Sequence, residues 1–197
     1  MWRKLPQDVP LKTVMTAVVL LLLNYGYGVW CLQQDLDSRT ETLQTALVQG
    51  NIPQELKWQP ENKLNTVKTY RDLSLRAERA GAKNLIIWPE AAMPFYFQDG
   101  GKLADSVSGL PVETGTYLLF GSPAYRRDVA GLRYLNSAFL LSPSAQVLGR
   151  SDKNHLVPFG EYVPLSGFLP FVNKLVVGIG DYSPGAINPL HIKEDQL

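Results

Sequence analysis

Cysteine and histidine are scarce in this chain, which has one cysteine, Cys31, and two histidines, His155 and His191, among 197 residues. A single cysteine excludes an internal disulfide and a cysteine-rich metal site, and two histidines are too few to form a zinc cluster by themselves. We therefore expect a function that uses neither a metal ion nor a cofactor.

An excess of charge of either sign is also absent. The sequence has 19 Lys and Arg against 18 Asp and Glu, for a net charge of +1. A nearly neutral field gives no reason to expect nucleic acid or an acidic partner. The apolar fraction of 45% is enough to bury the core of one domain of ordinary size, which excludes disorder for most of the chain.

Charged residues are missing altogether from one stretch, the 22 positions 13–34 between Lys12 and Asp35. A helix of that length reaches about 33 Å, close to the hydrocarbon thickness of a bilayer. Its second half contains Tyr25, Tyr27 and Trp30, residue types favoured at a membrane–water interface. We predict a transmembrane helix over 13–34.

Basic residues precede this segment and acidic ones follow it. The positive-inside rule then places residues 1–12 in the cytoplasm and everything after the helix outside. A cleaved signal peptide is an alternative, although no small-residue cleavage site follows. A buried core helix is a second alternative, which the length of the segment disfavours.

A polar linker is predicted over 35–44, and an α/β domain over 45–197. Apolar residues recur every three or four positions over 61–80, which predicts an amphipathic helix between a strand beginning at Thr45 and a strand over 84–90. The two strands should be parallel, with a right-handed crossover. Further along, the pattern predicts a short helix over 102–108, strands over 116–120, 134–141 and 146–152, and a turn over 126–131.

Two polar side chains are predicted at the ends of strands. Glu90 follows the apolar run NLIIWP, where Pro89 ends the ladder, and we expect neighbouring aromatic residues to shield it from water. Lys153 follows the strand over 146–152. Ligands of open α/β sheets bind at such strand ends, and a base beside a fixed cation suits acyl transfer. The plainer alternative is that both residues, and Glu161 nearby, are solvated surface charges.

Two motifs carry a family resemblance. WPE at 88–90, followed by KNHLVPFGEYVP at 153–164, is similar to the nitrilase, or carbon-nitrogen hydrolase, superfamily. Together with LVQGNIPQELKW at 47–58, the second motif resembles the bacterial apolipoprotein N-acyltransferases within it. The resemblance implies an α/β fold, an αββα sandwich preceded by a transmembrane helix. The sandwich should be incomplete, because the chain matches only the N-terminal part of that domain.

The resemblance also implies an activity. Members of this family take an acyl chain from a phospholipid, hold it as a thioester on a cysteine, and pass it to the amino group of a diacylglyceryl-cysteine lipoprotein. The expected partners are therefore the phospholipid donor, the apolipoprotein acceptor and the membrane, with no nucleic acid. The expected location is the bacterial inner membrane, with the nitrilase-like domain on the periplasmic side.

By matched position, the resemblance gives four residues a role. Glu90 corresponds to the general base, Lys153 to the cation that stabilises the oxyanion, and Glu161 to a supporting carboxylate. Trp58 lies where the family has a tryptophan beside the acyl site. Aromatic residues 95–97 and apolar residues 168–172 are further candidates for loops that dip into lipid, or else for ordinary core packing.

One departure stands out, because the family's nucleophilic cysteine follows the lysine and this sequence has no cysteine after Cys31. We therefore expect the chain to be an inactive fragment of an acyltransferase. Two alternatives stay open. One is a membrane-anchored nitrilase-like amidase, and the other is a non-catalytic, degenerate domain that binds a partner.

Overall fold

The computed structural model describes residues 10–33, 43–81, 84–129, 131–162 and 182–192. The chain divides into two units, Met1–Thr42 and Leu43–Leu197. The described part of the first unit is helix α1, Leu11–Gln33, which is long and apolar enough to cross a membrane. Most of the predicted linker lies outside the described residues.

The second unit is built on one mixed sheet with the strand order β1-β2-β3-β4-β5. Its strands are β1 Thr45–Leu47, β2 Leu85–Ile87, β3 Tyr117–Asp128, β4 Gly131–Leu141 and β5 Val147–Asp152. β1, β2 and β3 are parallel to one another, with Ala46 opposite Ile86 and Ile86 opposite Leu118. The predicted parallel strand–helix–strand unit is confirmed. β4 and β5 continue the sheet in antiparallel fashion.

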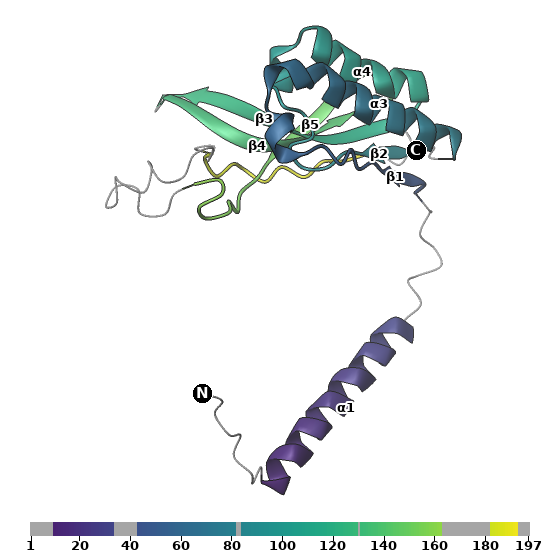
Figure 1. Ribbon diagram of the computed structural model, residues 1–197, viewed down its shortest axis with the longest axis vertical. Coiled ribbons are helices and arrows are strands. Elements are labelled where there is room, and N and C mark those ends of the chain that lie inside the picture. The colour runs from purple at the N-terminus through teal and green to yellow at the C-terminus, as the bar shows by residue number, and fades with distance from the viewer. Residues whose placement is uncertain (1–9, 34–42, 82–83, 130, 163–181, 193–197) are drawn as a thin grey trace. The chain divides into compact units, whose positions relative to one another are not determined.

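Two helices, α3 Lys63–Arg79 and α4 Lys102–Thr114, cover one face of this sheet (Figure 1). Shorter helices are α2 Gln54–Lys57, η1 Pro60–Asn62 and η2 Phe97–Asp99. α3 buries one face, which includes Tyr70 and Ser74. Tyr70 stacks on Trp88 at 5.1 Å, and the Trp88 indole N–H donates to the Ser74 hydroxyl at 2.8 Å. The helix is thereby fixed to the residue that follows β2.

An aromatic cluster fills the space between the helices and the sheet. Phe120 contacts Phe97 and Phe139, with ring centroids 4.9 and 5.7 Å apart, and all three are buried. The prediction of a lipid-dipping loop is wrong for Phe97, because its ring completes this core. Residues 168–172 lie outside the described residues.

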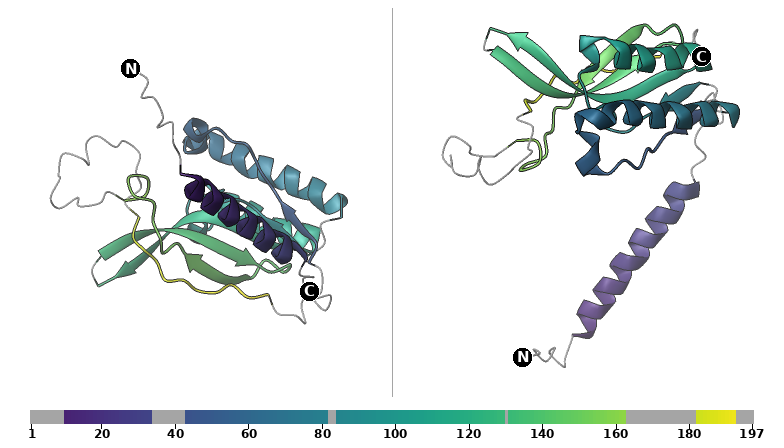
Figure 2. Two further views of the ribbon diagram at one scale, coloured as in Figure 1. Left: turned by 90° about the horizontal axis from the view of Figure 1, so that it is seen from below. Right: turned by 45° about the horizontal axis from the view of Figure 1, so that its top comes forward.

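The opposite face of the sheet is covered by the extended segment 182–192, yellow in Figure 1 and seen from two further sides in Figure 2. Its residues Leu190 and Ile192 pack against Leu85, Tyr117 and Leu140. The described residues thus form one helical layer and one sheet, which is half of the αββα sandwich that the sequence predicts.

Two elements are longer than predicted. α4 continues through Pro111 to Thr114, because the Pro111 carbonyl still accepts from the Gly115 N–H at 2.8 Å and the proline is itself buried. The predicted turn over 126–131 is mostly strand, since residues 126–128 pair with 131–133. Their charged side chains suggest a loop, but a hairpin ladder is made by backbone groups and tolerates charge on exposed faces.

Candidate active site

Glu90 lies in a turn that is docked on β3. The Trp88 N–H donates to the Leu119 carbonyl at 2.8 Å, and the Met93 N–H donates to the Gly121 carbonyl at 3.0 Å. Ala91 has φ +49°, in the left-handed region that non-glycine residues rarely adopt. A Cβ on Gly121 would lie 2.8 Å from the Cα of Glu90 and closer still to the Ala91 nitrogen. The turn can therefore approach β3 because residue 121 has no side chain.

Lys153 directly follows β5, as predicted. Its N–H donates to the Asn136 carbonyl on β4 at 2.8 Å, and its carbonyl accepts from the Gly185 N–H at 2.9 Å. The backbone of Lys153 is therefore held from both sides, by β4 and by the segment that crosses the sheet.

Glu161 closes a tight turn. Its N–H donates to the Val157 carbonyl at 2.8 Å, and its Oε2 accepts from the Val157 N–H at 2.8 Å. Phe159 within this turn has φ +59°. The carboxylate of Glu161 is therefore held by the backbone of its own loop, independently of its contacts with other side chains.

The side chains of Glu90, Lys153 and Glu161 meet at one point. The Lys153 ammonium lies 2.9 Å from Glu90 Oε1 and 2.9 Å from Glu161 Oε2. Asn136 Nδ2 donates to both carboxylates, at 2.5 Å to Glu90 and 2.8 Å to Glu161. The structure thus brings together the three residues that the sequence singled out, and it adds Asn136.

Asn136 was missed by the sequence analysis. It lies on β4, is 7% exposed, and faces the carboxylates with both hydrogens of its amide. The available signal is a polar residue in the middle of β4, just before its apolar end, which does not by itself distinguish a site residue from an exposed one.

These contacts determine the direction in which the pKa values of Lys153 and Glu161 shift. Burial lowers the pKa of Lys153, but hydrogen bonds and charges from Glu90 and Glu161 outweigh it, and the pKa is raised. Burial raises the pKa of Glu161, but the Val157 N–H, the Asn136 amide and the Lys153 ammonium together leave it lowered. At neutral pH, Lys153 is therefore a cation and Glu161 an anion. The expected shielding of Glu90 by aromatic residues is wrong, since its side chain is 61% exposed beside polar neighbours.

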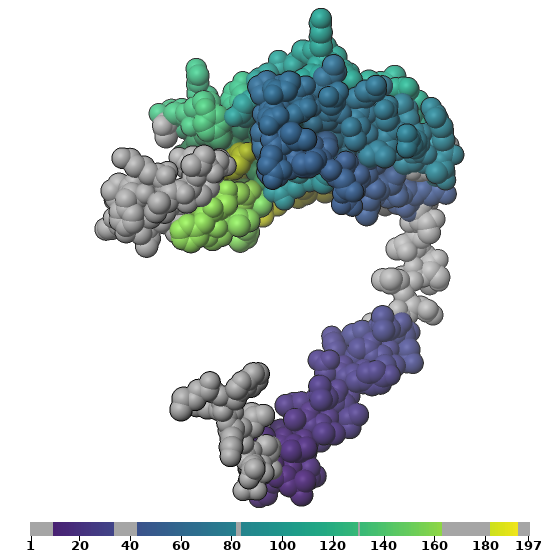
Figure 3. Space-filling view, in the orientation of Figure 1, coloured from purple at the N-terminus to yellow at the C-terminus, as the bar shows by residue number. Residues whose placement is uncertain are grey.

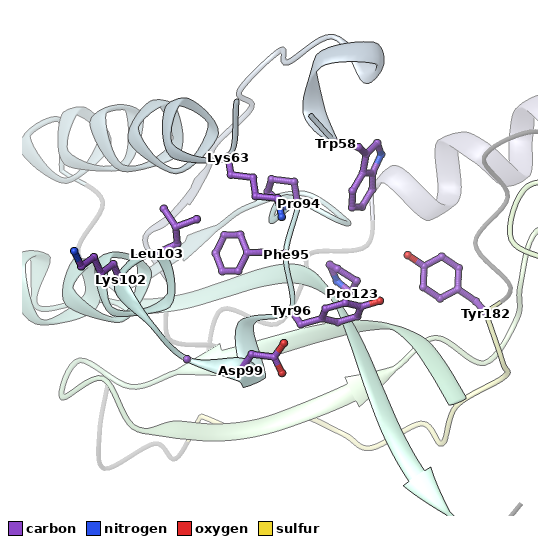
Figure 4. Close-up of a pocket in the computed structure, with 11 residues that line it drawn as sticks. Trp58, Lys63, Pro94, Phe95, Tyr96, Asp99, Lys102, Leu103, Pro123 and Tyr182 are labelled. Atoms are coloured by element: carbon purple, nitrogen blue, oxygen red, sulfur yellow. The ribbon is translucent and has the colours of Figure 1, made fainter. Parts of the chain in front are cut away.

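Glu90 and Glu161 open into a cavity of about 640 Å³ that Lys57, Trp58, Asn136 and Tyr182 also line. Burial lowers the pKa of Lys57, against the opposing charge of Glu90. Trp58 and Tyr182 are shared with a second cavity of about 600 Å³, where Figure 4 shows their rings together with those of Phe95 and Tyr96. The charged site thus continues into an aromatic one.

Metal ligands do not gather at this site. Within the described ranges, no group of three His, Cys, Asp or Glu side chains has the geometry to hold an ion. The single cysteine, Cys31, is exposed on α1 in the other unit, so the α/β domain supplies no thiol.

Comparison with known proteins identifies the family of this chain. A family model described as carbon-nitrogen hydrolase matches residues 44–178, more than half of the chain. The chain belongs to the carbon-nitrogen hydrolase family. The matched range contains Trp58, Glu90, Asn136, Lys153 and Glu161, so the whole cluster lies within the family's domain.

Two relatives within this family are named apolipoprotein N-acyltransferase. The protein from Geobacter metallireducens is 51% identical over 181 residues, which cover 92% of this chain and 34% of the relative. The protein from Methylococcus capsulatus is 38% identical over 151 residues, which cover 74% of this chain and 28% of the relative. The chain therefore spans about a third of the length of these relatives. An amidase from Nesterenkonia sp. is similar in structure, with a TM-score of 0.48 and 17% identity over 74% of this chain and 49% of that one.

Gly121→Ala should lower the free energy of unfolding by about 1–3 kcal/mol, because the new methyl group collides with the turn that carries Glu90. Urea unfolding of the purified chain measures this. Gly109→Ala, in α4, is the matched control, since a Cβ at that position would have only one atom within 4 Å, at 3.9 Å. This substitution should be neutral or stabilising by up to about 1 kcal/mol, because alanine favours the helix more than glycine. Equal effects of the two substitutions would contradict the close approach at Gly121.

Glu161→Gln should remove part of the dependence of stability on acid pH. The folded-state pKa of Glu161 is lowered from its ordinary value of 4.5, so its contribution is present above that pH and is lost as pH falls through the folded value. Unfolding free energies measured between neutral and strongly acid pH should decline less steeply in the variant. Glu55→Gln, on an exposed turn of α2, is the control and should show the same dependence of stability on pH as the parent chain. If Glu161→Gln also shows the parent dependence, the carboxylate of Glu161 is not held as described.

Proposed function

We propose that the α/β domain of this chain carries the acid and the lysine of an apolipoprotein N-acyltransferase. The observation that supports this most directly is the contact of Lys153 with Glu90 and Glu161, in a chain 51% identical to a protein of that name. The contact places a proton acceptor and a fixed cation beside a cavity of about 450 Å³, lined by Glu90, Asn136 and Lys153, which is large enough for an ester group.

In this proposal, Glu90 is the general base that takes the proton of a cysteine thiol. The thiolate attacks the ester carbonyl of a phospholipid, and Lys153 donates a hydrogen bond to the oxyanion that forms. An ammonium has three donors and the two carboxylates accept two of them, which leaves one for the oxyanion. When the C–O bond breaks, the proton returns from Glu90 to the departing alkoxide and a thioester remains.

In the second half reaction Glu90 acts in the same way, with an amine as the nucleophile and the cysteine thiolate as the leaving group. The amino group of a diacylglyceryl-cysteine lipoprotein attacks the thioester and gives a proton to Glu90, and the C–S bond breaks as the amide forms. The thiolate then recovers that proton. Glu161 and Asn136 are positioning residues here, because they contact Glu90 or Lys153 and hold them at a fixed separation.

Substrate binding and location complete the proposal. Trp58 borders both cavities, where it can line the path of the acyl chain. α1 crosses the bacterial inner membrane with residues 1–12 in the cytoplasm, and the domain lies on the periplasmic side, near both the phospholipid donor and the lipoprotein acceptor. The support is the length and hydropathy of α1 and the basic residues that precede it.

The chain alone should form no acyl thioester, because its α/β domain has no cysteine. Incubation with a phospholipid that carries a labelled acyl chain should leave the protein unlabelled after denaturation, whereas the Geobacter metallireducens relative should be labelled. Label on this chain that hydroxylamine releases, and that Cys31→Ser abolishes, would contradict this expectation.

A chimera tests the catalytic roles. Residues 44–178 of this chain replace the matched region of the Geobacter metallireducens relative, in membranes that lack another N-acyltransferase. We expect the chimera to add an acyl chain to a lipoprotein, measured by mass. Glu90→Gln and Lys153→Met should each slow it by about a hundredfold or more, since each removes a group required in the transition state. Glu55→Gln should not slow it.

Two outcomes of the chimera experiment would count against the proposal. A folded chimera that retains its rate with Glu90→Gln or with Lys153→Met would exclude the substituted residue from catalysis. Hydrolysis of short amides without acyl transfer to lipoprotein would favour an anchored amidase.

A further inference from the structure

The β3–β4 hairpin extends well beyond the sheet. β2 pairs with β3 only as far as Leu119, and β5 pairs with β4 only from Ser137 onward. Residues 124–128 and 131–135 therefore pair with each other, apart from one bridge between Tyr134 and Tyr182. We call residues 125–129 and 131–134 the ribbon. In Figure 1 it projects past the ends of α3 and α4, and Figure 3 shows its green end standing clear of the domain.

Positive charge is concentrated on the ribbon. It has three exposed arginines, Arg126, Arg127 and Arg133, and one acid, Asp128, which give it a net charge of +2, whereas that of the whole chain is +1. Arg126 lies directly opposite Arg133 in the ladder, an arrangement that costs stability in the absence of an anion. Asp128 forms an ion pair with Arg133 at 2.9 Å, and one carboxylate cannot neutralise three guanidinium groups.

Apolar and aromatic side chains accompany these arginines. Val129 at the tip is fully exposed, and Leu132 and Tyr134 are 44% and 40% exposed. The ladder places Leu132 opposite Arg127 and Tyr134 opposite Tyr125, so these four share one face, while Arg126 and Arg133 lie on the other face. Arginine and tyrosine beside exposed aliphatic residues are the composition of an element at a membrane–water interface.

The same face leads to the candidate active site. Asn136 is two residues beyond Tyr134 on β4, so its side chain points to the same side of the sheet. Tyr96, which lines the aromatic cavity, packs edge-on against Tyr125 at 5.3 Å. The exposed face of the ribbon is therefore continuous with the cavities.

We infer that the ribbon docks on an anionic phospholipid surface, with its arginines at the lipid phosphates and Val129 and Leu132 among the headgroups. The charge of the ribbon complements such a surface. The same chain contains α1, which has the length and hydropathy of a membrane span, so a bilayer is the partner available to a tethered domain. The inference concerns binding and is independent of acyl transfer.

A fluorescent label at the tip tests this in the full chain. Cys31→Ser removes the native thiol, and Val129→Cys is labelled with an environment-sensitive nitrobenzoxadiazole dye. The protein is reconstituted into vesicles of phosphatidylcholine, with or without phosphatidylglycerol. We expect a blue shift and a rise in intensity with phosphatidylglycerol, and their loss at high salt. Val112→Cys is the matched control, since it is 59% exposed on α4, and it should not respond.

Charge removal gives a second measurement. Arg126→Gln, Arg127→Gln and Arg133→Gln combined should lower the docking equilibrium constant by about tenfold or more, since each cation contributes near an anionic surface. Lys68→Gln, Arg76→Gln and Arg79→Gln combined make the same charge change on exposed positions of α3 and should leave docking unchanged. If the triple variant does not fold, the loss of docking with increasing salt, measured on the chain with its arginines intact, still tests the electrostatic contribution to docking.

Three results would overturn the inference. They are a tip label that does not distinguish the two vesicle types, a response that resists salt, and an equal response at Val112. A tip label that responds to polyglutamate but not to vesicles would show that the partner is an acidic protein instead. Because no turnover is measured, failure here leaves the acyltransferase proposal standing, and failure of the chimera leaves docking standing.

Discussion

The ammonium of Lys153 between the carboxylates of Glu90 and Glu161 is the interaction on which this site depends. Without the cation, two acids that share the amide of Asn136 would repel each other, and one of them would have to take up a proton or move away. With the cation, that repulsion is offset, and the Lys153 ammonium is among the groups that lower the pKa of Glu161. Because Glu161 is held by its own loop, the more exposed Glu90 is the member of the pair that can reach a substrate.

Such a cluster requires backbone segments to approach closely, and the chain meets this requirement with small residues and strained torsions. Gly121 lets the turn of Glu90 lie against β3, and Gly185 lets the crossing segment lie against Asp152, just before Lys153. Ala91 has φ +49° next to Glu90. Unfavourable backbone conformations that the surrounding structure maintains are concentrated at functional sites, and here they lie beside the acid and the lysine.

The parts of the site that could be predicted are those that depend on local sequence. An apolar run that ends in Trp-Pro places Glu90 after a strand, and Lys153 ends a strand in the same way. Asn136 and Gly121 could not be predicted, because their roles depend on which strands are neighbours and in which register. Gly121 lies opposite Ala138, in a pairing that no local pattern encodes. The exposure of Glu90 was misjudged for the same reason, since its aromatic neighbours in sequence point into the core behind it.

One strand, β4, links the core, the site and the ribbon. Phe139 packs in the aromatic core, Asn136 holds the two carboxylates, and Leu132 lies on the exposed face of the ribbon. Four residues of strand separate Asn136 from Leu132, a distance of about 13 Å. A phospholipid that docks at the ribbon must move over about this distance to bring its ester to Glu90 and Lys153, because only the glycerol backbone separates the ester from the phosphate. A paired strand is also stiff enough to hold that separation constant.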